Sequence, residues 1–171
     1  MEAAKIMAGR LKEYMMDRQG VTSIAGYDGD PLVHVRWKPT PENPGNYSNF
    51  GACCSIVEVD TLTGEIDLLY SDLSYDCARS MNPAIDIGQV EGGFMMGVGM
   101  FIQENEWIDP NSGRLLADGT WEYKPPLAND IPKEFNVRLF ENKYKKGVCS
   151  SKSSGEAPLL LSGSVYAAIR Q

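Results

Sequence analysis

One acidic residue, Glu156, lies where a carboxylate could act as a base. It stands between Gly155 and Ala157-Pro158, at the start of the apolar run LLLSGSVYAAI. The N-terminus of a helix favours the charged form of a carboxylate, whereas neighbouring leucines withdraw water from it and favour the neutral form. Opposed effects of this kind can prepare a general base. A carboxylate that only caps the helix is the alternative that the residues leave open.

A second candidate, Gln89, lies in a segment rich in glycine. Asn82 followed by Pro83 predicts the start of a helix, and glycines then occupy positions 88, 92, 93, 97 and 99. Each interior glycine costs about 1 kcal/mol relative to alanine, so close packing must offset the loss. Helical spacing places the Gln89 carboxamide, both donor and acceptor, on one face with Ile85, Gly92, Gly93 and Met96. That face suits a heteroatom-rich ligand or a closely packed second helix.

Four blocks of the sequence resemble a known enzyme family in a consistent order. They are GACCSIVEVDTLTGEIDLLYSD (51–72), SMNPAIDIGQVEGGFMMGVG (80–99), DIPKEFNVRLFEN (130–142) and SKSSGEAPLLL (151–161). Together they are similar to the C-terminal part of the molybdopterin-binding region of the xanthine dehydrogenase and aldehyde oxidase family, the molybdenum hydroxylases. One short motif would carry little weight, but the order of all four makes the resemblance specific.

The resemblance implies a reaction and a set of site residues. Glu156 matches the catalytic base of the family, and Gln89 matches a glutamine that hydrogen-bonds the molybdopterin cofactor. We expect the same cofactor to meet Gly92, Ser153, Ser154 and Gly155, and we expect no protein side chain to bind the metal directly. The implied reaction is hydroxylation of an aromatic heterocycle or an aldehyde with oxygen taken from water.

The length of the chain limits how much of such an enzyme it can supply. Its 171 residues suit one domain or a piece of one, whereas the family has long chains with separate iron–sulfur, FAD and molybdenum regions. We therefore expect residues 1–171 to be one fragment of a molybdopterin-binding domain that binds no cofactor alone. The remainder of the hydroxylase, in the same protein or as a separate subunit, would be its partner, and the resemblance implies a homodimeric parent enzyme.

Composition excludes several classes of function. The net charge of −7, with no strong basic cluster, argues against nucleic acid as a partner. No apolar stretch reaches the length of about 18 residues that a membrane span needs. The N-terminus lacks the charged and apolar regions of a secretory leader, so a cytoplasmic location is expected.

The cysteines and the single histidine do not suggest a metal site. Cysteines 53, 54, 77 and 149 have neither zinc-site nor iron–sulfur spacing, and adjacent strand residues point to opposite faces. We expect reduced thiols in the core. His34 has no partner at ligand spacing and is expected to be structural or exposed.

Periodicity predicts the elements that position these residues. An amphipathic helix is expected over 2–18, mostly loop over 26–49, and a β-hairpin from Phe50–Asp60 and Glu65–Leu73 with Gly64 in its turn. Ile66, Leu68 and Tyr70 should share one side of the second strand. Further along, we expect a short strand pair near 109–119, a strand over Glu134–Phe140 and a helix over Pro158–Arg170.

These elements predict an α+β fold, a mixed subdomain with antiparallel β-hairpins and packed helices, within a larger molybdenum-binding domain. Two hypotheses of different class remain open. The chain is part of a working molybdenum hydroxylase, or it is a non-catalytic remnant that folds or binds a partner without cofactor.

Overall fold

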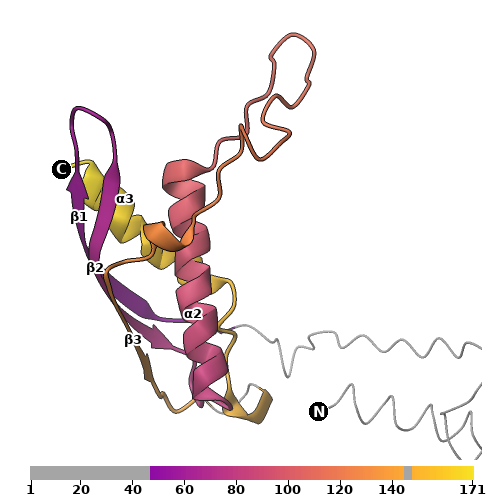
Figure 1. Ribbon diagram of the computed structural model, residues 1–171. Coiled ribbons are helices and arrows are strands. Elements are labelled where there is room, and N and C mark those ends of the chain that lie inside the picture. Colours follow the sequence, from indigo (N-terminus) through magenta and orange to yellow (C-terminus); the bar gives the residue numbers. More distant parts are fainter. Residues whose placement is uncertain (1–46, 145–147) are drawn as a thin grey trace, which may run out of the picture. The chain divides into compact units, whose positions relative to one another are not determined.

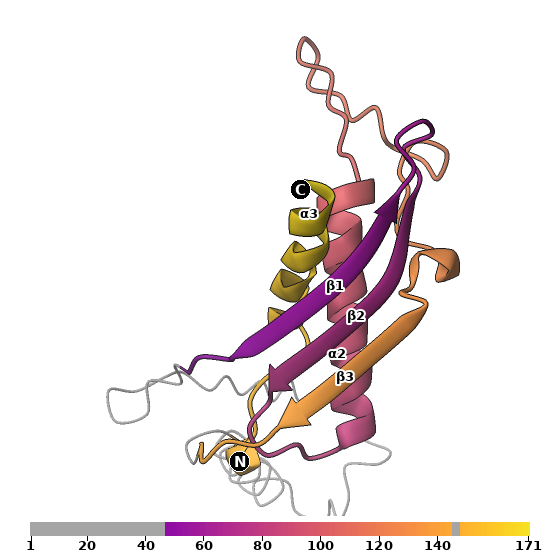
Figure 2. The same cartoon turned by 90° about the vertical axis from the view of Figure 1, so that its left-hand side faces the viewer.

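Three strands form one mixed sheet in the computed structural model, which describes residues 47–144 and 148–171 (Figure 1). They are β1 (Gly51–Val59), β2 (Ile66–Asp76) and β3 (Glu134–Phe140), in the order β1-β2-β3. Two helices, α2 (Pro83–Val98) and α3 (Gly163–Ile169), lie against the same face of the sheet (Figure 2). The α+β class is therefore confirmed. The helix expected over 2–18, the loop over 26–46 and His34 lie outside the described residues.

The predicted hairpin of β1 and β2 is confirmed. Its turn is closed by Asp60, whose Oδ1 accepts a hydrogen bond from the Leu62 amide at 2.8 Å, and by Gly64, whose φ is +78°. A backbone with positive φ is the conformation that glycine adopts without steric cost.

An irregularity in β2 changes which side chains face the helices. Ile56 pairs with Tyr70 but Val57 pairs with Leu68, so that Leu69 is an extra residue on β2. A bulge of this kind shifts the alternation of side chains by one position. Leu68, Ser71, Leu73 and Tyr75 are buried, whereas Tyr70 faces the other side and donates to Asp72 at 3.1 Å. The expectation that Tyr70 shares a side with Ile66 and Leu68 is therefore wrong.

The third strand, β3, has the predicted bounds but pairs with β2 in parallel. Among these three strands, the antiparallel pairing that we expected is found between β1 and β2. Parallel neighbours need a long crossover connection. The chain between β2 and β3 supplies it, because it contains α2 and returns to the end of the sheet at which β2 began.

Helix α2 begins as predicted, at Pro83, and continues through its glycines. The Asn82 side chain accepts a hydrogen bond from the Ile85 amide at 3.4 Å. After Val98 the helix widens into a π-helical turn, η1 (Gly99–Gln103).

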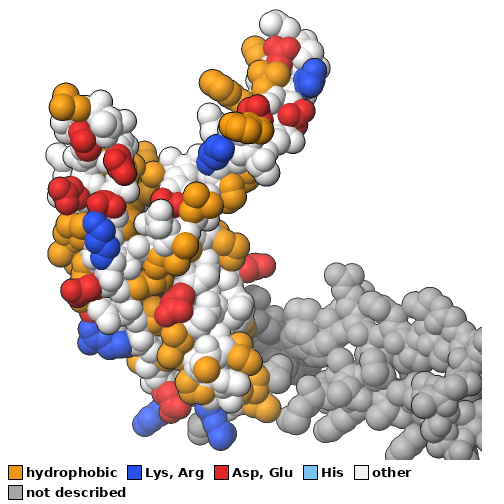
Figure 3. Space-filling model, in the orientation of Figure 1, with side chains coloured by type: hydrophobic (Ala, Val, Ile, Leu, Met, Phe, Trp, Pro, Cys, Tyr) orange, Lys and Arg blue, Asp and Glu red, His pale blue; other side chains and the backbone are white. Residues whose placement is uncertain are grey.

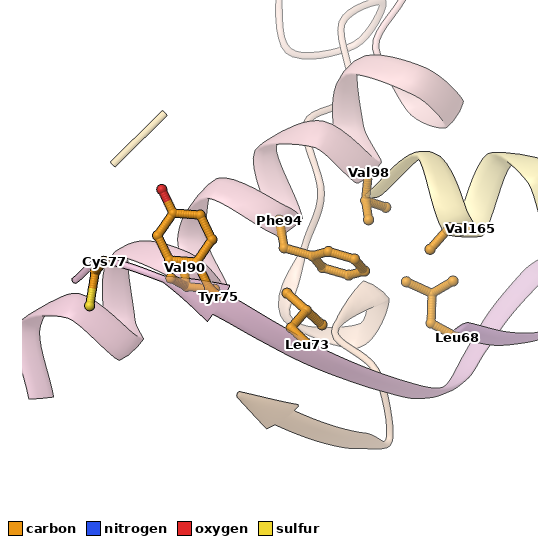
Figure 4. Close-up of a cluster of buried hydrophobic side chains, with 8 residues drawn as sticks. All are labelled: Leu68, Leu73, Tyr75, Cys77, Val90, Phe94, Val98 and Val165. Carbon is orange, nitrogen blue, oxygen red and sulfur yellow. The ribbon is translucent and has the colours of Figure 1, made fainter. Parts of the chain in front are cut away.

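The hydrophobic core lies between the sheet and the helices (Figure 4). Strand β2 supplies three of its buried residues, helix α2 supplies three more, and α3 supplies Val165. Leu73 of β2 and Phe94 of α2 are fully buried in this core. Burial of such a side chain contributes about 1.5–3 kcal/mol to the free energy of folding. The cluster consists of Leu68, Leu73, Tyr75, Cys77, Val90, Phe94, Val98 and Val165.

The C-terminal helix expected over Pro158–Arg170 is divided into two parts. A tight 3-10 helix, η4 (Ala157–Ser162), precedes α3. Within η4 the Ser162 hydroxyl donates to the Leu159 carbonyl at 2.6 Å. This side-chain bond competes with regular α-helical pairing and accounts for the tighter first part.

Between η1 and η2 (Ala128–Asp130), residues 104–127 form an arm that projects from the sheet and helices (Figures 1 and 3). The strand pair expected near 109–119 amounts to one isolated bridge, Ile108 to Leu115. The arm exposes large apolar side chains, with Trp107 65% and Trp121 85% exposed. Such exposed apolar surface is typical of a region that contacts another protein surface.

The cysteines are free, but they are not all core residues. Cys77 is buried and Cys53 is half-buried, whereas Cys54 and Cys149 are exposed. The prediction of core thiols is therefore wrong for the last two. Among residues 47–144 and 148–171, no helix is both long enough and apolar enough to cross a membrane.

Candidate active site

Glu156 immediately precedes η4, and its side chain is exposed. Although it occupies the capping position, this side chain makes no capping hydrogen bond. Pro158, two residues later, is buried against the body of the protein and fixes the start of η4. Glu156 thus lies at the surface next to a buried anchor, where its carboxylate can meet a ligand.

The loop before Glu156 is held mainly by side chains. Lys152 forms a buried ion pair with Asp76 at the end of β2. The Ser153 carbonyl accepts from the Tyr75 hydroxyl at 2.7 Å, and the buried Ser154 hydroxyl donates to Asp86 Oδ1 at 2.7 Å. Asp86 lies in the first turn of α2, so the loop is connected to both the sheet and the helix.

The Ser153 backbone and the Ser154 hydroxyl already have hydrogen-bond partners within the protein. The Ser153 amide already donates to the Tyr47 hydroxyl at 3.0 Å, and the Asn49 carboxamide donates to the Ser153 carbonyl at 2.8 Å. The Ser154 hydroxyl is directed to Asp86.

Gln89 lies beside this loop. A Cβ atom built on Gly155 would lie 3.3 Å from Gln89 Oε1, so the carboxamide and the residue before Glu156 are close neighbours. The Gln89 residue is itself exposed. The structure therefore brings Gln89 next to the Gly155-Glu156 segment, from which it is far apart in the sequence.

The glycines of α2 fall into two groups. A Cβ on Gly93 would lie 3.1 Å from the Gly155 carbonyl, and one on Gly97 would overlap the Ser162 hydroxyl and the Leu159 carbonyl. These two glycines allow η4 to approach the helix. At Gly88 and Gly92 a Cβ would meet nothing within 4 Å. The open side of α2 thus combines exposed glycine backbone with the Gln89 carboxamide.

This arrangement fits a cofactor rich in heteroatoms. Gln89 offers donors and an acceptor, Gly92 permits close approach of a flat ligand to the helix, and Glu156 presents a carboxylate nearby. Within the described ranges, no three His, Cys, Asp or Glu side chains are grouped so as to hold a metal ion.

Burial affects two ionisable groups beneath the loop. It raises the pKa of the Tyr75 phenol to about 12, and the Cys77 thiol nearby adds to the effect. Burial also raises the pKa of Cys77. Both groups therefore stay protonated at neutral pH, and Tyr75 acts as a hydrogen-bond donor to the loop.

Sequence reasoning did not single out Asp76, Asp86 or Lys152. Asp86 and Lys152 lie inside the two segments that carry Gln89 and Glu156. The available signal was a charged residue close to a candidate site residue in a largely apolar segment, because a buried charge needs a partner. Neither segment alone, however, indicates which residue that partner is.

Comparison with known proteins identifies the family. A family model described as a molybdopterin cofactor-binding domain matches residues 2–132, a range that includes Gln89 and Gly92 and ends before Glu156. The chain is 51% identical over 139 residues to probable aldehyde oxidase 2 of Oryza sativa subsp. japonica, covering 81% of this chain and 10% of that protein. It is 50% identical over 140 residues to an indole-3-acetaldehyde oxidase of Zea mays, again covering 81% of this chain and 10% of the relative.

Solved structures show the same fold. Quinoline 2-oxidoreductase from Pseudomonas putida 86 matches with a TM-score of 0.62 and 27% identity, over 67% of this chain and 14% of that one. CO dehydrogenase from Oligotropha carboxidovorans matches with a TM-score of 0.63 and 23% identity, over 70% and 15%. The chain spans about a tenth of the length of the curated relatives that it matches. By the extent of the family match and the identity to these relatives, the chain belongs to the molybdopterin cofactor-binding domain family.

Proposed function

We propose that the chain supplies part of the active site of a molybdenum-dependent oxidoreductase of the aldehyde oxidase type. In this assignment Glu156 is the general base, and Gln89 with Gly92 forms part of the cofactor site. The observation that carries the proposal is the exposed, uncapped Glu156, which directly follows Gly155, the loop residue that lies next to Gln89. Identity of about 50% to aldehyde oxidases supports it.

Glu156 would act by holding and moving a proton. Its exposed carboxylate can accept a proton from a bound water or hydroxyl, which makes that oxygen a better nucleophile toward an electrophilic carbon. The rigid start of η4 and the anchored loop limit the positions that this carboxylate can take. Such positioning reduces the entropy that the reaction must lose.

Gln89 and the glycines would bind and orient the cofactor. The carboxamide can make one or two hydrogen bonds to heteroatoms of the ligand. Gly92 leaves space for the ligand against α2. Ser153, Ser154 and Gly155 would line its other side through their backbone, because the Ser154 hydroxyl is buried and donates to Asp86. When bound, the molybdenum cofactor supplies the two-electron redox chemistry.

For the substrate class, we propose aldehydes first and aromatic heterocycles second. The relatives with the higher identity are named as aldehyde oxidases, including indole-3-acetaldehyde oxidases, whereas the quinoline enzyme is 27% identical. Hydroxylation of either substrate, including the purines used by xanthine dehydrogenases, requires an activated oxygen and a hydride acceptor. The same base can serve both.

The remaining parts of the site would come from other sequence. Because the chain spans a tenth of its relatives, we propose that the rest of the hydroxylase is its partner and carries the iron–sulfur and FAD groups. The exposed arm with Trp107 and Trp121 supports such a contact. We further propose a homodimeric enzyme in the cytoplasm.

The alternative is a structural remnant without cofactor. Its support is that one short chain supplies only one side of a site, whereas small-molecule sites bury most of their ligand. Metal analysis of the protein from its native source separates the two possibilities, since a remnant contains no molybdenum.

The test of the proposed base is Glu156→Gln in the complete enzyme. Glutamine preserves shape but cannot accept the proton, so reduction of the metal by an aldehyde should slow by about 10² to 10⁴ while molybdenum content is unchanged. If Glu156 only stabilises η4, the substitution should instead lower the unfolding free energy by about 1 kcal/mol and leave the rate nearly unchanged. Anaerobic rapid mixing and thermal unfolding of the same proteins distinguish them, and a rate within a few-fold of wild type refutes the assignment.

A further inference from the structure

The position of Glu156 depends on the loop that precedes it. Residues 152–154 belong to no helix or strand, and Glu156 makes no capping hydrogen bond of its own. Its place is therefore determined by the contacts of its neighbours along the chain. The contact farthest inside the protein is the ion pair between Lys152 and Asp76.

This pair is deeply buried and fully hydrogen-bonded. The side chains are 3% exposed for Lys152 and fully buried for Asp76. Asp76 Oδ2 accepts from Lys152 Nζ and from Asn142, and Asp76 Oδ1 accepts from the Ala78 amide at 2.8 Å. Lys152 Nζ also donates to the Ser48 carbonyl at 2.8 Å. No buried side-chain nitrogen or oxygen of the described residues lacks a partner.

The backbone around the pair is tied together in an unusual conformation. The Lys152 amide donates to the Cys77 carbonyl at 2.9 Å, and Ala78 forms an isolated bridge with Ser151. Ala78 has a φ of +53° and Ser150 a φ of +64°, values that side-chain-bearing residues rarely adopt. Strain of this kind persists only where the surroundings impose it.

A buried ion pair is a costly way to stabilise a fold, because desolvation offsets much of the attraction. What it provides is a fixed distance and direction between two chain segments. Here one segment is the end of β2, and the other leads to Glu156 four residues later. An apolar contact at the same place would fill the space without fixing that direction.

We propose that Lys152 and Asp76 are positioning residues for the Glu156 carboxylate. The pair fixes the start of the loop. Ser154, which contacts Asp86, and Gly155, which lies next to Gln89, then hold the rest of the loop against α2 up to Glu156. This inference rests on the proposed role of Glu156 as the base. A displacement of about 1 Å can reduce a catalytic rate about 10²-fold.

The deciding variant is Asp76→Asn/Lys152→Gln in the complete enzyme. It replaces the ion pair with a neutral amide pair that can still hydrogen-bond but is shorter, so that the loop moves without leaving a lone buried charge. The matched control is Asp67→Asn/Lys133→Gln, which removes an exposed ion pair, 2.7 Å in separation, whose carboxylate also belongs to β2. Lys152→Met alone should lower the yield of folded protein, because it leaves the buried Asp76 carboxylate without its cation.

With benzaldehyde as substrate, we expect the amide pair to slow metal reduction by about 10- to 100-fold, with molybdenum content near wild type. The control should stay at the wild-type rate. In a Glu156→Gln background, the same amide pair should cause less than about a twofold further loss, because residues that act through one group are not additive. A role in folding alone would lower protein yield and leave the rate per molybdenum unchanged.

Each outcome decides between the two claims. If Glu156→Gln slows reduction but the amide pair does not, the positioning role is refuted and the base remains. If the amide pair slows reduction equally in both backgrounds, it acts independently of Glu156 and the inference is also refuted. If Glu156→Gln has no effect, both claims fail. If the enzyme with the amide pair does not assemble, Lys152→Arg replaces it, because arginine keeps the charge and alters the length of the side chain. A slower rate of metal reduction per molybdenum then supports the positioning role, and an unchanged rate refutes it.

Discussion

The two sides of helix α2 carry the same residue type for different reasons. On one side Gly93 and Gly97 lie under η4, where an added methyl group would contact or overlap backbone atoms. On the other side Gly88 and Gly92 face open space. The covered glycines are explained by packing within the chain, whereas no contact among the described residues explains the open ones.

This difference teaches how to interpret a glycine-rich helix. Both alternatives offered by the sequence, close helix packing and a floor for a ligand, were reasonable for the whole run. The structure assigns the packing explanation to Gly93 and Gly97, which lie under η4, and to Gly99, where an added Cβ would overlap Glu104 and Pro126. The open side, with Gln89 and Gly92, is where we place the cofactor, and substitutions on the two sides should separate the two explanations.

The largest effect is expected for Gly97→Ala. Its new methyl group would overlap the Ser162 hydroxyl and the Leu159 carbonyl, and backbone cannot give way cheaply. Overpacking of this kind should lower the unfolding free energy of the chain by about 3 kcal/mol, measured by urea unfolding. Gly93→Ala should have a smaller effect, because its nearest contact is 3.1 Å away. Unchanged stability in Gly97→Ala would contradict the close approach of η4.

A smaller effect is expected for Gln89→Ala in the complete enzyme. Loss of one or two hydrogen bonds, each worth about 0.5–1.5 kcal/mol, should lower cofactor occupancy or perturb the spectrum of the metal. The fold should survive, because Gln89 is exposed and alanine favours helix. Molybdenum content and turnover equal to those of wild type would remove Gln89 from the cofactor site.

The smallest effect on stability, and one of opposite sign, is expected for Gly92→Ala. The chain should gain up to about 1 kcal/mol of unfolding free energy, because alanine is the better helix former and its methyl group meets nothing. In the complete enzyme the same methyl group should obstruct the cofactor and reduce molybdenum content. Gly88→Ala, also in open space, is the comparison that shows how far along α2 the ligand extends. Normal molybdenum content in Gly92→Ala would mean that the open side is not the cofactor site.

Local signals predicted the start of α2 and the turn of the hairpin, whereas the strand pair near 109–119 and an unbroken C-terminal helix were not found. Asn82 and Pro83 gave the start of α2, and Gly64 gave the hairpin turn. The residues could not show that β3 joins β2 in parallel, because that pairing depends on the path of the connection. Nor could they show the extra residue at Leu69, since a bulge leaves composition unchanged.

The candidate site was predicted less completely. Glu156 and Gln89 were identified separately, and only the resemblance to a family placed them together. The anchoring residues Asp76 and Asp86 hold the loop through pairs separated by more than 60 residues in sequence. Such pairs arise from tertiary packing, which the spacing of residues in a single sequence does not encode.

The position of α3 has a consequence for the order of events during synthesis. Val165 completes the core, and the Ser164 hydroxyl hydrogen-bonds that of Ser55 at 2.8 Å on β1, more than 100 residues earlier. Helix α2 follows the hairpin directly and can cover part of its apolar face early, but the part of β1 that lies under α3 stays uncovered until residues up to 169 have emerged. At about 5–20 residues per second, that delay lasts several seconds. Until then the core lacks Val165, so the last residues of the chain are needed to complete it.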